Sequence, residues 1–116
     1  MREIKFRAWD GNKKRMIDKA LEVAMLISKT PVKQKTGTLV HFMQYTGLKD
    51  KNGVEIYEGD IVRLVGWGYT GYVAFENCEF ITKSGKCGDY AMSPKQNHDY
   101  LVIGNIHENQ ELLNET

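Results

Sequence analysis

Turn-forming residues interrupt the second half of the chain at short intervals, and this spacing limits the folds that it can adopt. Asp50, Asn52 and Gly53 form one turn cluster, and Gly59 and Gly71 are two of the glycines that follow. Asn-Gly is the strongest short signal for a hairpin turn. Only short strands fit between such turns, which favours a small curled sheet or barrel. The predicted strands are 60–65, 71–75, 79–83 and 100–106.

The first half of the chain opens with a strand pattern of its own. Residues 4–9 alternate between two faces, with Ile4, Phe6 and Ala8 on one of them. The residues at 10–12, Asp-Gly-Asn, tolerate a tight turn, so we expect a hairpin that returns through Met16 and Ile17. A polar loop over 29–38 and an apolar run over 39–45 follow, with a further turn predicted at 45–47.

Residues 18–29 fit two kinds of secondary structure. Leu21, Val23, Met25 and Ile27 alternate as in a strand, whereas Leu21, Ala24, Met25 and Ser28 would share one face of a helix. We favour the strand.

Near the C-terminal end, Asn109 precedes residues 110–113 as a helix cap would, so we expect a short terminal helical turn there.

These patterns together predict a mainly β protein. Residues 1–47 form an N-terminal β-hairpin or small sheet, and residues 48–116 form a C-terminal small β-barrel. No internal repeat or low-complexity segment is visible. A chain of 116 residues is long enough for one domain or for two very small β units, which excludes a large multidomain enzyme.

Composition and charge narrow the class of protein further. With 41% hydrophobic and 27% charged residues the chain is expected to fold rather than remain disordered. It has no apolar run of membrane-spanning length and no signal-peptide pattern, so we expect a cytoplasmic protein without a membrane partner.

The charges are divided unevenly along the chain. Residues 1–51 carry twelve Lys/Arg and five Asp/Glu, whereas residues 52–116 carry four Lys/Arg and ten Asp/Glu, so the two halves have opposite net charge. This polarity is compatible with a basic nucleic-acid face, with contact between subunits, or with contact between the halves of one chain.

Four blocks of sequence, in order along the chain, resemble the YopX family of phage and prophage proteins. They are MREIKFRAWD at 1–10, MQYTGLKDKNG at 43–53, EIYEGDIV at 55–62 and VIGNIHENQELL at 102–113. The resemblance implies an SH3-like barrel in the C-terminal part and an origin in a phage or prophage of a bacterial host. It implies no activity, because the family is functionally uncharacterised. Turn residues such as Gly53, Gly59 and Asp60 also have a purely structural explanation in a tight barrel.

A stretch of aromatic residues spaced by glycines is the first candidate binding site. Trp67, Tyr69 and Tyr72 lie within residues 66–72, at the predicted first long turn of the barrel. Their rings could stack on a peptide, a base or a methylated cation. The alternative is that they fold onto the barrel as part of its core.

A basic cluster at the predicted hairpin tip is the second candidate. Lys13, Lys14 and Arg15 could neutralise phosphates, while Phe6 and Trp9 could stack on bases. A solvated hairpin tip has the same composition, and the total net charge of +1 weakens the case for nucleic acid.

Metal binding and catalysis find little support in the sequence. Cys78, Cys87, His98 and His107 are possible zinc ligands, but they lack the close pair that structural zinc sites use, so we predict no metal and no cofactor. Reduced cysteines that pack as small apolar residues, with the histidines on the surface, are the simpler account. No nucleophile elbow or phosphate-binding loop is present, and we predict no catalytic residues and no enzyme activity.

The sequence therefore leads to three functional hypotheses. The first is a non-catalytic phage accessory protein that binds a phage or host protein or its own copies, as a closed homo-oligomer. The second is a nonspecific nucleic-acid-binding module, and the third is a small enzyme.

Overall fold

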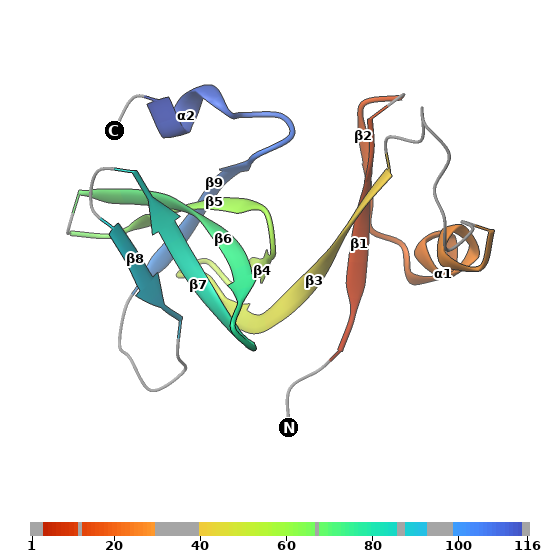
Figure 1. The fold of residues 1–116 in the computed structure, drawn as a ribbon, viewed down its shortest axis with the longest axis horizontal. Coiled ribbons are helices and arrows are strands. Elements are labelled where there is room, and N and C mark those ends of the chain that lie inside the picture. Colours follow the sequence, from red (N-terminus) through yellow and green to blue (C-terminus); the bar gives the residue numbers. More distant parts are fainter. Residues whose placement is uncertain are drawn as a thin grey trace. The chain divides into compact units, whose positions relative to one another are not determined.

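The computed structural model describes residues 4–11, 13–29, 40–66, 68–85, 88–92 and 99–114. They form a mainly β fold, as predicted, with strand orders β2-β1-β3-β4 and β8-β7-β6-β5-β9 in its two sheets (Figure 1). The chain divides into two units, residues 1–45 and 46–116. The elements are β1 (Phe6–Asp10), β2 (Arg15–Ile17), α1 (Ala20–Lys29), β3 (Val40–Lys49), β4 (Glu55–Tyr57), β5 (Asp60–Leu64), β6 (Tyr69–Glu76), β7 (Glu79–Ser84), β8 (Gly88–Ala91), β9 (Tyr100–Asn105) and α2 (Glu111–Asn114).

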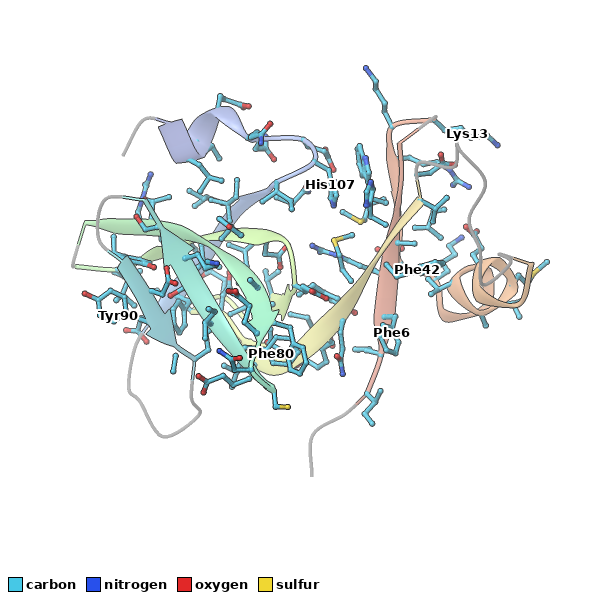
Figure 2. All side chains as sticks on the ribbon, viewed as in Figure 1. Phe6, Lys13, Phe42, Phe80, Tyr90 and His107 are labelled. Carbon is cyan, nitrogen blue, oxygen red and sulfur yellow. The ribbon has the colours of Figure 1, made fainter. Side chains whose placement is uncertain are left out.

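The first unit is built around β1, which lies between β2 and β3. Ala8 pairs with Ile17 on one side and with Phe42 on the other, both antiparallel, so the predicted hairpin is confirmed. Ala8 and Ile17 form a small core with Val23 of α1, and Phe42 packs against this core from the sheet (Figure 2). The predicted loop over 29–38 lies almost entirely outside the described residues.

Residues 20–29 form a helix, so the predicted strand is wrong. Val23 is only 4% exposed, whereas Leu21 is 74% and Met25 46% exposed, so the alternating residues do not share one buried face. Alanine, leucine, glutamate and methionine favour a helix, and this local preference outweighs the alternation because, of residues 21–25, only Val23 is buried in the core. The helix starts with a bond from the Val23 N–H to the Lys19 carbonyl, at 3.0 Å.

The predicted turn at 45–47 is also wrong, because β3 runs through it from Val40 to Lys49. The hydroxyl of Thr46 donates to the Ile56 carbonyl on β4 at 2.8 Å and accepts the Leu48 N–H at 3.1 Å. The hydroxyl thus bonds to β4 and to its own strand, which supports a continuous β3 at this position. The second predicted turn, over 50–53, is confirmed by the bond from the Gly53 N–H to the Asp50 carbonyl at 3.0 Å.

The second unit holds the curled five-stranded sheet (Figure 1). Its strands β5, β6, β7 and β9 contain the apolar residues that the sequence assigned to one C-terminal sheet, which confirms that prediction. The short strands β4 and β8 were not predicted. The main core cluster is made of Ile56, Val62, Leu64, Tyr69, Val73, Phe80 and Tyr100.

Two finer predictions in this unit are confirmed. Gly59 adopts a φ of 88°, in the left-handed region, and donates its N–H to the Val73 carbonyl at 2.8 Å immediately before β5. The terminal turn forms as α2, in which the Leu112 N–H bonds the Asn109 carbonyl at 2.9 Å. Among the described residues, neither helix is both long enough and apolar enough to span a bilayer.

The hairpin that joins β6 and β7 turns through two residues with positive φ, Asn77 at 52° and Cys78 at 64°. This is the backbone of a type I′ turn, in which the second position strongly prefers glycine. Cys78 has a free and exposed thiol, so the prediction that it packs as a small apolar residue is wrong. A side chain in this conformation strains the backbone by about 1–2 kcal/mol.

We therefore expect Cys78→Gly to stabilise the protein. Relief of the strain, offset in part by the greater freedom of glycine in the unfolded chain, should raise the free energy of unfolding by about 0.5–1 kcal/mol. Urea denaturation measures the change. Cys78→Ser is the control, because it removes the thiol and keeps the strain; equal stability of the two variants would contradict the explanation.

Candidate interaction surface

The carboxylate of Asp50 joins two distant parts of the second unit. Its Oδ1 accepts the backbone N–H groups of Asn52 at 2.8 Å and Val54 at 2.9 Å, and its Oδ2 accepts that of Val102 at 3.0 Å. Asp50 is 7% exposed. A residue of the MQYTGLKDKNG block thus holds the turn before β4 against β9.

The charge of Asp50 is stabilised by this arrangement. Burial by itself would raise the pKa of the carboxyl, because it disfavours the ionised form. The three N–H donors, from Val102, Val54 and Asn52, act in the opposite direction and hold the pKa below its ordinary value. Asp50 is therefore an ionised structural group rather than a proton donor poised near neutral pH.

Polar residues of the other quoted blocks also bind backbone atoms. Asp60, which is 1% exposed, accepts the Tyr57 N–H on Oδ2 at 2.7 Å. Asn105 accepts the N–H groups of His107 and Glu108 on its side-chain oxygen, at 3.0 and 2.9 Å. These contacts explain the blocks by the fold, because each side chain closes a turn that leads into or out of a strand.

Two other groups in the second unit have raised pKa values. Burial raises the pKa of Tyr100, and a hydrogen bond to Glu76 raises that of Lys83. Both shifts favour the form that already dominates at neutral pH. Neither shift favours a role in general acid–base catalysis at neutral pH.

The predicted aromatic site does not gather as one open surface in the described residues. Tyr69 is 5% exposed, its hydroxyl lies 3.0 Å from the Gly88 carbonyl and 3.2 Å from the Thr82 hydroxyl, and its ring meets Tyr90 edge-on at 5.3 Å. Tyr69 therefore packs in the core and holds β8 to its neighbours, and its ring is not open to a partner. Tyr72 is half-buried, and Trp67 lies outside the described residues.

The predicted basic cluster lies on the surface of the first unit. Lys13, Lys14 and Arg15 are exposed, and Lys13 projects from the tip of the hairpin (Figure 2). Arg15 lies 3.8 Å from Glu22 of α1, so the cluster borders the first turn of the helix. Trp9 is 7% exposed, so it cannot stack on a base as the sequence suggested.

The four possible zinc ligands are not brought together in the part of the chain that the structure describes. Cys78 is exposed at the β6–β7 turn, and His107 is half-buried after β9. Cys87 and His98 lie outside the described residues. No group of three or more metal-ligating side chains occurs among the residues that are described.

A third exposed surface, beyond the two candidates that the sequence suggested, lies on α1. Leu21, Ala24 and Met25 are all exposed, and their spacing of three and four residues places them on one face of the helix. We call these three residues the α1 stripe. The helical spacing of these residues is visible in the sequence, but we favoured a strand there and so did not predict this surface.

A second exposed apolar side chain lies at the end of the β6–β7 hairpin. Phe75 is 43% exposed, and its ring packs on Phe80 with centroids 4.8 Å apart. Glu76 and Glu79, the next pair along the two strands, are also exposed, and the alternation of side chains in a strand places them on the face of the sheet opposite Phe75.

Comparison with known proteins identifies relatives but no activity. A model of the YopX family, described as YopX protein, matches residues 5–114. A solved structure, the crystal structure of protein EF1440 from Enterococcus faecalis, is 31% identical to this chain with a TM-score of 0.64, and the match covers 97% of this chain and 99% of that one. No curated protein matches the sequence.

We expect Asp50→Asn to destabilise the protein at neutral pH. An amide can offer an oxygen to one or two of the three N–H groups, but its NH₂ faces the remainder, and a buried donor without an acceptor costs about 1–3 kcal/mol. Because the pKa of Asp50 is lowered, its contribution is complete above the ordinary value of about 3.9 and is lost as the pH falls through the lowered value.

Chemical denaturation of both proteins at pH 7 and in acid measures this effect. The difference between wild type and variant should be largest at pH 7 and should shrink in acid. Asp89→Asn, at an exposed position on β8, is the matched control. An equal effect of the two substitutions at pH 7 would show that the Asp50 network contributes no special stability.

Proposed function

The chain belongs to the YopX family, and we propose that it is a non-catalytic protein-binding module, an accessory protein of a phage or prophage that acts in the cytoplasm of a bacterial host. The observation that carries the proposal is the exposed α1 stripe. Leu21 is 74% and Met25 46% exposed, on a helix of only ten residues. Exposed apolar side chains that line up on a helix are a recurrent means of protein recognition, because the helix inserts them together into a groove.

The polar residues of the family blocks support a non-catalytic role. Asp50, Asp60 and Asn105 all accept backbone N–H groups within the second unit. Side chains that hold turns in this way are not free to bind or activate a substrate. The function then rests on surfaces rather than on a reactive centre.

The α1 stripe is well placed to act without disturbing the fold. Val23 alone anchors the described part of the helix in the core, with Ala8 and Ile17. The opposite face of the helix can therefore change its chemistry while the sheet beneath it remains intact. Glutamate is also a good helix former, so it can replace leucine or methionine there with little effect on the helix.

The proposal predicts that a charge on the α1 stripe abolishes partner binding. In affinity capture from a lysate of the bacterial host, wild type should retain a protein that Leu21→Glu and Met25→Glu each lose. The physical reason is that full burial of one such apolar side chain contributes about 1.5–3 kcal/mol, which the charged variant forfeits.

Val54→Glu is the control for this experiment. Val54 is 48% exposed, close to the value for Met25, but it lies in the turn before β4 in the second unit. It should retain the same protein as wild type. If all four proteins capture the same set, α1 is not a binding surface.

The exposed basic cluster favours nucleic-acid binding as a second candidate function. If the protein binds DNA, replacing Lys13, Lys14 and Arg15 by alanine should weaken binding and lower the slope of log affinity against log salt by about 0.9 for each lost phosphate contact. Titration at several salt concentrations measures both. Lys51→Ala, at an exposed position in the second unit, is the control; a slope that the triple variant leaves unchanged would exclude this cluster as the DNA contact.

A further inference from the structure

The five-stranded sheet of the second unit ends in two edges that differ in their hydrogen bonds. At one edge lies β9, whose Val102 N–H donates to Oδ2 of Asp50 at 3.0 Å. The Tyr100 carbonyl of the same strand accepts the Lys51 N–H at 2.8 Å. At the other edge lies β8, which pairs only with β7 in the described part of the sheet (Figure 1). One edge is therefore closed by hydrogen bonds and the other is open.

The register shows which backbone groups of β8 face outward. The Met92 N–H donates to the Phe80 carbonyl of β7 at 3.0 Å, and in an antiparallel pair only every second residue exchanges hydrogen bonds with its neighbour. Residues 88, 90 and 92 therefore face β7. The N–H and C=O groups of Asp89 and Ala91 point away from β7, and no strand of the described sheet lies there to pair with them.

The side chains along this edge alternate between the two faces of the sheet. Tyr90 lies on the core face, because its ring meets Tyr69 edge-on at 5.3 Å, yet it is 56% exposed at the edge (Figure 2). Met92 packs against the same core. Asp89 and Ala91 are exposed and lie on the opposite face. A strand beside β8 thus meets an apolar row on one face and a carboxylate on the other.

The charge around Asp89 favours a cation in that strand. Asp89 stands opposite Lys83 of β7, but the Lys83 ammonium lies 2.8 Å from a carboxylate oxygen of Glu76. Residues 46–116 carry six Lys/Arg against eleven Asp/Glu, a net −5. Opposite charges that face each other across strands stabilise a sheet, whereas like charges destabilise it.

We infer that β8 is a docking edge for an extended segment of a partner protein, which adds to the sheet as a further antiparallel strand. The segment alternates apolar with polar side chains and places a basic residue opposite Asp89. Main-chain hydrogen bonds supply the affinity of such contacts, and the alternate side chains supply their specificity. The inference adds a second surface to the proposed protein-binding role and does not use the α1 stripe.

Hydrogen exchange of the full chain, measured by NMR with and without a capped peptide, tests the inference. The probe is acetyl-Thr-Val-Thr-Val-Lys-Val-Thr-amide, which as an antiparallel strand places valines beside Tyr90 and Met92 and its lysine opposite Asp89. The amides of Asp89 and Ala91 should become protected on binding, because they gain acceptors. The Tyr90 amide, which already faces β7, should not change. A peptide with glutamate in place of the lysine should bind about fivefold more weakly at low salt.

Two matched peptides test the main-chain pairing on the wild-type protein. A methyl group on the backbone nitrogen of the lysine removes a donor that faces β8, and it should weaken binding by about fivefold or more. The same change at the preceding valine removes a donor that faces away, so binding should be unchanged.

Ala91→Pro makes the same test on the protein. Proline at this position removes the outward N–H and leaves the bonds between β8 and β7 in place, as proline on an edge strand does. This variant should also bind the probe about fivefold more weakly. Urea denaturation reports whether it is folded; if it is not, the methylated peptides decide.

Three results would overturn the inference. If millimolar probe leaves the amides of Asp89 and Ala91 unprotected, β8 is not a docking edge. Equal binding of the two methylated peptides would exclude main-chain pairing as the contact. Equal binding of the lysine and glutamate peptides would exclude a basic segment as the occupant. The α1 experiment is unaffected by these results, so failure here is distinct from failure of the proposed function.

Discussion

The carboxylate of Asp50 is the interaction on which the second unit depends most visibly. Its three backbone partners lie two, four and 52 residues further along the chain. One ionised side chain therefore fixes a local turn and also sets where β9 returns. Each of these backbone N–H groups would lose its acceptor with the carboxylate, which costs free energy wherever water cannot replace it. The neighbouring contact, from the Lys51 N–H to the Tyr100 carbonyl at 2.8 Å, reinforces the same junction.

The polar side chains of the family blocks hold the fold together, so they do not by themselves indicate a function. The residues by which the chain resembles its family are largely those that close turns, such as Asp50, Asp60 and Asn105. A match to the family consequently shows the architecture, and the match to the Enterococcus faecalis structure shows it again. Leu21 and Met25 of α1, in contrast, are apolar side chains that remain exposed, and they lie outside the four family blocks. Such surfaces can vary between relatives without loss of the fold.

Local patterns predicted the parts of the structure in which local and tertiary preferences agree. The hairpin around residues 10–12, the turn at 50–53 and the strands β5, β6, β7 and β9 follow from turn chemistry and alternation. Residues 20–29 were mispredicted because alternation of Leu21, Val23 and Met25 fits a strand, while the residue types favour a helix. Whether these residues form a helix or a strand depended on how many of their side chains could be buried, and that number is set by the sheet against which α1 packs.

The exposure of the candidate site residues was likewise predictable only where neighbouring residues decide it. The exposure of Lys13, Lys14 and Arg15 could be predicted, because a hairpin tip of charged residues has no means of burial. The burial of Tyr69 was one of two interpretations of the sequence, and the choice between them depended on Thr82 and Gly88, which are far away in sequence.

The sequence by itself determined that this chain is mainly β, where most of its turns lie and that its charge is divided between its two ends, because these properties depend on residue type and on neighbours a few positions apart. Only the tertiary structure decided which apolar side chains are covered, since Val23 is buried and Leu21 exposed on the same helix. Burial depends on strands that approach from distant parts of the chain, and no local pattern encodes their position.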